Sequence, residues 1–132
     1  MASIQKDVAI KAPAADVWDA LADFGALHRR LVFGFVTDAY LDGDTRVVTF
    51  ANGNVAQEML VDCDADRKRL VYAIHNERVA HYNASVQVFA DGKQKSRLVW
   101  IVDVIPHEVG PYIAAQMDQA ALAMQSTLDR EA

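Results

Sequence analysis

The sequence has 132 residues, of which 52% are hydrophobic, and it carries a formal net charge of −5. Its length and apolar content predict one globular domain, residues 1–132, with a core of its own. The negative charge speaks against a nucleic-acid partner, because a phosphate backbone requires clustered cations, and without a run of about twenty apolar residues no membrane span is expected.

The N-terminal part predicts one strand and two short helices. Alternating apolar residues predict the strand at Ile4–Ile10. Pro13 suits the first turn of a helix, where its missing N–H has no hydrogen bond to make. The apolar face of this helix comprises Val17, Trp18, Leu21 and Phe24. Gly25 ends the helix, and residues 26–30 are long enough for one more helical turn.

Six strands separated by turn residues are predicted next. Asp42-Gly43-Asp44 and Asn52-Gly53-Asn54 are two of these turns. The strands are predicted at Val32–Leu41, Thr45–Ala51, Val55–Cys63, Leu70–His75, His81–Phe89 and Ser96–Ile105. Because the connections are short, the six strands most simply form an antiparallel meander.

A long helix is predicted from Pro106 to Ala132, with Pro111 in its first turn. Its apolar residues recur every three or four positions, at Val109, Ile113, Met117, Ala120, Met124 and Leu128. Alanine and methionine leave space and can repack around a guest, although such a stripe is also typical of ordinary core. Only this helix is long enough to cover the apolar face of the meander.

Three sequence motifs resemble those of one superfamily (SRPBCC). It comprises START lipid-transfer domains, birch-pollen-allergen-like proteins and polyketide cyclases/dehydratases. The first motif is Ala-Pro-Ala-x-x-Val-Trp-x-x-Leu-x-Asp-Phe at residues 12–24. The others are Gly53 with Glu58-Met59-Leu60 and Arg67-x-x-Leu70-x-Tyr72, and then Trp100 followed by Pro106. The resemblance implies an α+β helix-grip fold. In this fold a seven-stranded antiparallel sheet wraps around the long C-terminal helix, with two short helices between strands 1 and 2.

The resemblance also implies a cavity between the sheet and the long helix. Arg46, Val48 and Phe50 share one face of their strand. A three-residue Asn52–Asn54 loop would set Val48 opposite Glu58 and Arg46 opposite Leu60, whereas a two-residue turn would reverse the faces. The spacing alone does not decide between the two registers, and the resemblance favours the first. In ligand-binding relatives the residues that match Glu58, Tyr72 and Tyr82 face the pocket.

The candidate ligand-binding residues are Arg46, Val48, Phe50, Glu58, Leu60, Tyr72, Tyr82, Trp100, Ile113, Met117 and Met124. The candidate residues of the cavity mouth are Asn52, Gly53, Asn54, His81 and His107. Glu58 is the candidate catalytic residue, because a carboxylate in an apolar cavity can bind or move a proton. Alternatively it is a solvated strand glutamate, or one satisfied by Arg46. The tyrosines could equally be core residues whose hydroxyls are satisfied.

Other chemistries find little support in the sequence. The four histidines show no paired ligand spacing, so no metal site is expected. Nucleotide-binding and nucleophile-elbow motifs are absent, so no cofactor is expected. The first residues lack the layout of a signal peptide, and Cys63 is the single cysteine. We therefore expect a cytoplasmic protein without internal disulfides.

Two classes of function follow, and the sequence favours the first. It is a carrier or sensor that encloses a small hydrophobic molecule as its partner. The second is an enzyme of the polyketide cyclase/dehydratase type, in which Glu58 acts as acid or base. An interaction domain with a vestigial pocket is a weaker third option. The sequence does not decide whether the protein forms a homodimer.

Overall fold

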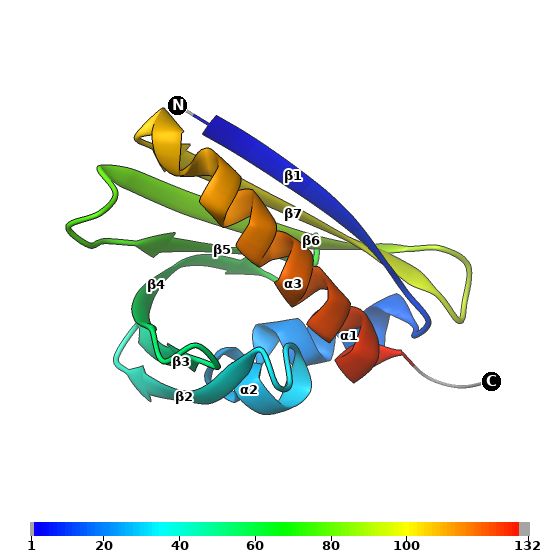
Figure 1. Ribbon diagram of the computed structural model, residues 1–132. Coiled ribbons are helices and arrows are strands. Elements are labelled where there is room, and N and C mark those ends of the chain that lie inside the picture. Colours follow the sequence, from blue (N-terminus) through cyan, green and yellow to red (C-terminus); the bar gives the residue numbers. More distant parts are fainter. Residues whose placement is uncertain (1, 130–132) are drawn as a thin grey trace.

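The computed structural model describes residues 2–129, which form an antiparallel sheet crossed by a long helix (Figure 1). The strands are β1 (Ala2–Ile10), β2 (Val36–Asp42), β3 (Thr45–Phe50), β4 (Val55–Asp64), β5 (Arg69–Ile74), β6 (His81–Ala90) and β7 (Ser96–Ile105). The helices are α1 (Ala14–Ala22), α2 (Leu27–Arg30) and α3 (Gly110–Leu128), with 3-10 turns η1 (Phe24–Ala26) and η2 (His107–Val109).

The sheet has the order β1-β7-β6-β5-β4-β3-β2, and all neighbours run antiparallel. Strands β2 to β7 therefore form the predicted meander. The first strand joins its far edge by pairing with β7 along its whole length, from Ala2 opposite Val104 to Ile10 opposite Ser96. The predicted helix-grip fold, with seven strands, a long C-terminal helix and short helices between β1 and β2, is confirmed among residues 2–129.

The helix α3 lies across one face of the curved sheet, and α1 and α2 lie beside its C-terminal end (Figure 1). Pro111 stands in its first turn, as predicted. Its buried side chains include Met117, Ala120 and Met124, so the small and flexible stripe faces the sheet. The predicted helix ran to Ala132; α3 ends at Leu128, and residues 130–132 lie outside the described part of the chain.

The start of the second strand was predicted wrongly. The sequence predicted it at Val32, but β2 begins at Val36. Residues between them form a turn instead, in which the backbone N–H groups of Phe35 and Val36 both donate to the carbonyl of Val32, at 3.1 Å. Gly34 has a φ of +88°, a conformation that glycine adopts without steric cost, and it lets the chain reverse here.

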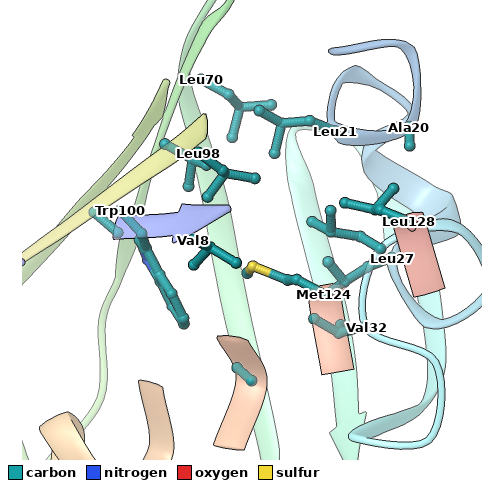
Figure 2. Close-up of a cluster of buried hydrophobic side chains, with 14 of the residues drawn as sticks. Val8, Ala20, Leu21, Leu27, Val32, Leu70, Leu98, Trp100, Met124 and Leu128 are labelled. Atoms are coloured by element: carbon teal, nitrogen blue, oxygen red, sulfur yellow. The ribbon is translucent and has the colours of Figure 1, made fainter. Parts of the chain in front are cut away.

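The hydrophobic core lies between α3, the short helices and the sheet. Figure 2 shows Leu128 of α3 beside Leu27 of α2, and Met124, Leu21 of α1 and Leu98 of β7 in the same cluster of buried side chains. Trp18, predicted on the apolar face of α1, is only half-buried and packs at the margin of this core, whereas Ala20 is buried in its place. No helix within residues 2–129 is long and apolar enough to cross a membrane.

Candidate functional site

A cavity of about 500 Å³ lies between α3 and the sheet. Strands β5, β6 and β7 supply one wall of it, with Leu70, Tyr72, Ile74, Tyr82, Val86 and Trp100. The helix α3 supplies the opposite wall through its apolar stripe, with Ile113, Met117, Ala120 and Met124. Cavities of this size and apolar lining are typical of sites for small organic molecules.

A third wall comes from α2 and from the segment that links it to β2. Leu27, Leu31, Val32 and Phe35 line the cavity there, and the sequence analysis did not assign them to it. The apolar character of this segment was visible in the sequence. The face of Val32 and Phe35 was not, because both were predicted in a strand, whereas the chain turns at Gly34.

The pairing of β3 with β4 differs from the predicted one. Arg46 lies directly opposite Glu58, and Val48 lies opposite Ala56. The connection consists of residues 51–53, because Phe50 donates its N–H to the carbonyl of Asn54 at 2.8 Å, and not of residues 52–54 as predicted. Since the loop still has three residues, the pairing is shifted by two positions and each side chain keeps its predicted face.

Arg46 and Glu58 form a buried ion pair at the cavity wall. The residues are 3% and 5% exposed, respectively. Nε and Nη2 of Arg46 donate to the same carboxylate oxygen, Oε1, at 2.8 and 2.6 Å, and Nη1 donates to the Phe24 carbonyl at 3.2 Å. The guanidinium carbon also lies 3.9 Å from the centre of the Phe24 ring and 5.5 Å from that of Tyr72. Arg46 is therefore held by charge, hydrogen bonds and aromatic faces together.

The second carboxylate oxygen of Glu58, Oε2, remains available. It accepts no hydrogen bond from residues 2–129, and it is not among the fully buried atoms that lack a partner. Because Glu58 lines the cavity, this oxygen is an acceptor offered to the cavity interior. The ion pair thus has one oxygen saturated by Arg46 and one open to a guest.

Tyr72, Tyr82 and Trp100 add further polar atoms to the same region. Burial raises the pKa of the Tyr72 hydroxyl well above its ordinary value, and the neighbouring Tyr82 and Glu58 raise it further. Burial also raises the pKa of Tyr82, again with a contribution from Glu58. Both phenols therefore stay protonated at neutral pH. The indole N–H of Trp100 is near enough to Tyr72 to favour its ionised form, yet it makes no hydrogen bond of good geometry.

The mouth of the cavity is formed by three segments. Of the residues predicted there, Asn52 and Asn54 of the β3–β4 connection line the cavity. Gly53, His81 and His107 do not line the cavity, and both histidines are exposed. Other residues, close to the two histidines in the sequence, line the cavity instead: Asn76, Arg78, Val79, Glu108, Val109 and Tyr112. The turns were located correctly, but the residues that point inward could not be read from turn composition.

Two further candidates lie outside the cavity lining. Val48 is completely buried in the core together with Ala39, its partner on β2. Leu60 packs against the core near the β2–β3 turn, where its N–H donates to the carbonyl of Asp44 at 2.8 Å. The other candidates, Arg46, Phe50, Glu58, Tyr72, Tyr82, Trp100, Ile113, Met117 and Met124, all line the cavity. Their roles toward a ligand stay predictions.

No group of three or more His, Cys, Asp or Glu residues within residues 2–129 is arranged to hold a metal ion. Cys63 is exposed, but the thiol is partly shielded from water. This partial burial raises the pKa of the thiol, and the nearby Asp62 and Asp64 raise it further. The thiol is therefore poorly suited to act as a nucleophile.

The sequence matches the family described as polyketide cyclase / dehydrase and lipid transport over residues 1–131. The chain belongs to this family. The resemblance stated from the sequence is thereby confirmed, and it extends over nearly the whole length of the chain. Among curated proteins, none matches its sequence.

Solved structures share the fold of this family member at low sequence identity. XoxI from Bacillus cereus superposes with a TM-score of 0.83 at 21% identity, covering 97% of this chain and 96% of XoxI. A START superfamily protein from Mycobacterium smegmatis gives 0.80 at 11% identity and 96% coverage of both chains. The ZhuI aromatase/cyclase from a Streptomyces species gives 0.71 at 18% identity, covering 96% of this chain and 90% of ZhuI.

Proposed function

We propose that this protein is a carrier or sensor that encloses a small hydrophobic molecule in the cavity beneath α3. The observation that supports the proposal is the cavity itself, of about 500 Å³, with aliphatic and aromatic side chains around a few polar atoms. A vestigial pocket in an interaction domain would be filled by side chains. The family, which includes lipid transport in its description, agrees with this function.

A cavity-filling variant tests the proposal. Ala120 is buried on α3 and lines the cavity, whereas Ala115 is exposed on the same helix and does not. We expect Ala120→Phe to weaken the binding of a neutral, environment-sensitive dye about tenfold or more, because the ring occupies the space of the guest. Ala115→Phe, with the same added volume, should bind the dye as the unmodified protein does.

Circular dichroism and a urea titration check that both variants fold. Equal dye affinity in the folded Ala120→Phe variant would contradict binding inside the cavity. Native mass spectrometry of the unmodified protein then identifies any small molecule that it retains through purification, and Ala120→Phe should retain less of it.

An enzyme of the polyketide cyclase/dehydratase type is the second candidate. It is favoured by the polar cluster, in which Glu58 Oε2 and the hydroxyls of Tyr72 and Tyr82 border the same cavity. An open carboxylate oxygen can accept a proton from an acidic C–H of a polyketone, and a protonated phenol can donate to the developing enolate oxygen. Enclosure by apolar walls would hold the chain folded for cyclisation.

Replacement of Glu58 separates the two candidates. If the protein is an enzyme, Glu58→Gln should lower the turnover of a cyclisable polyketone on the order of a hundredfold or more, as loss of a general base does. If it is a carrier, only ligand affinity should shift, by roughly one or two kcal/mol. Glu77→Gln is the matched control, since Glu77 is exposed in the β5–β6 loop and does not line the cavity. No turnover by the unmodified protein would remove the enzyme hypothesis.

A further inference from the structure

The charges that line the cavity cancel. Among residues 2–129, the charged side chains of the lining are Arg46, Glu58, Arg78 and Glu108, two of each sign. Arg78 and Glu108 are exposed at the mouth, where water and salt screen them. The interior therefore contains a single ion pair with no excess charge.

Arg46 already has its charge paired and three of its five N–H donors engaged. Two of its nitrogens donate to Glu58 Oε1 and a third donates to the Phe24 carbonyl, while the Phe24 and Tyr72 rings lie against the guanidinium plane. A ligand carboxylate at this place would compete with Glu58 for the single positive charge of Arg46. It would then leave two negative charges next to one positive charge in an apolar enclosure, where charges are poorly screened.

The open polar atoms suit a neutral group instead. No residue in the described range 2–129 donates to Glu58 Oε2, and an acceptor that carries negative charge forms strong hydrogen bonds with O–H donors. Tyr72 and Tyr82 line the same cavity, and their hydroxyls can donate to an oxygen of a ligand. A hydroxyl group both donates and accepts, so it can satisfy both kinds of atom at once.

We propose that the cavity selects uncharged hydrophobic molecules that carry a hydroxyl group, and discriminates against carboxylates of the same skeleton. This specificity rests on the proposed ligand-binding function and names its ligand class. It differs from binding by apolar contact alone, in which a bare hydrocarbon would bind as well as its hydroxylated analogue.

Three probes with one skeleton test the specificity on the unmodified protein. Naphthalene, 1-naphthol and 1-naphthoate compete at neutral pH with a neutral dye held in the cavity. We expect 1-naphthol to bind about tenfold tighter than naphthalene, the effect of one hydrogen bond to a charged acceptor, and at least tenfold tighter than 1-naphthoate. Decan-1-ol and decanoate repeat the comparison on a flexible skeleton.

The outcomes distinguish this specificity from the proposed function. Binding of 1-naphthoate as tight as that of 1-naphthol, or equal binding of naphthalene and 1-naphthol, would overturn the specificity while leaving the cavity a binding site. Failure of every probe, and of the dye, would overturn the proposed function and the specificity with it.

A variant then reverses the preference. Glu58→Gln keeps the size of the side chain but removes its negative charge, so that Arg46 becomes an unpaired cation at the cavity wall. The variant should gain about tenfold in affinity for 1-naphthoate and lose affinity for 1-naphthol, while Glu77→Gln should keep the original order. An unchanged order in Glu58→Gln would overturn the specificity. If that variant does not fold, Tyr82→Phe provides the test and should weaken 1-naphthol more than naphthalene; equal weakening would overturn it.

Discussion

Among single residues, the buried ion pair of Arg46 and Glu58 both stabilises the fold and positions a polar group at the cavity wall. Removing a charge from water is costly, and the cost is offset only while the partner charge and its hydrogen bonds are in place. The pair has them: two hydrogen bonds to Oε1 and one to the Phe24 carbonyl, which also ties η1 to β3. The same contacts fix the position of the one open carboxylate oxygen.

Replacing one residue of the pair should therefore lower the free energy of unfolding more than replacing both. We expect Arg46→Met to lower the free energy of unfolding by about 3–5 kcal/mol, because Glu58 is left buried without its cation. The double variant Arg46→Met/Glu58→Leu should recover most of that loss. Urea denaturation measures both. The control is Arg97→Met, whose ion pair with Asp7 is about half exposed and should contribute under about 1 kcal/mol. A double variant as unstable as Arg46→Met would contradict the argument.

At the scale of elements, the β3–β4 connection sets which side chains meet across the sheet. Its three residues, 51–53, place Arg46 opposite Glu58. Gly53 holds a φ of +90°, a conformation that L-residues with a side chain rarely adopt. Asn52 supports the turn, because its side-chain oxygen accepts the N–H of Asn54 at 2.9 Å.

Substitution of Gly53 should lower stability because of its backbone conformation and not because of a steric clash of the new side chain. An added Cβ would meet no atom within 4 Å, so steric contact cannot cause the loss. We expect Gly53→Ala to destabilise the protein by about 1 kcal/mol, and Gly53→Asn by less, because asparagine tolerates positive φ better. Urea denaturation gives the order. A loss for Gly53→Asn equal to or larger than that for Gly53→Ala would show that the backbone angle is not the cause.

For the whole molecule, the burial of two tyrosines makes the free energy of unfolding depend on pH in the alkaline range. Burial raises the pKa of Tyr72 and of Tyr82 above the ordinary value of 10.0. In the unfolded chain both phenols regain that ordinary value. The unfolded state consequently loses these protons first as the pH rises, and the folded state is then disfavoured.

We therefore expect full stability from these residues below about pH 10 and a decline above it, toward their raised folded-state pKa values. The double variant Tyr72→Phe/Tyr82→Phe should show a shallower decline over the same alkaline range. Chemical denaturation of both proteins at a series of pH values measures the slopes. Parallel slopes would mean that the two hydroxyls keep their protons no better in the folded protein than in the unfolded one.

The order of the regular elements, and most of their positions, could be predicted from the sequence. The strand Ser96–Ile105 was predicted with its observed ends, because its inward positions Leu98, Trp100 and Val102 are all apolar and a turn precedes it. Short turns between successive strands left the meander as the simplest arrangement, and only one helix could cover it. These features depend on local conformation and on the period of apolar residues, which are properties of short segments.

Only the tertiary structure decided which side chains meet in the cavity. The pairing of Arg46 with Glu58 depends on one hydrogen bond that closes the loop a residue earlier than its composition indicates. Likewise, a turn at Gly34 replaces the predicted start of the second strand, and Val32 and Phe35 of that turn line the cavity. Such choices are made by long-range packing and pairing, whose energies exceed local preferences and leave no periodic trace in the chain.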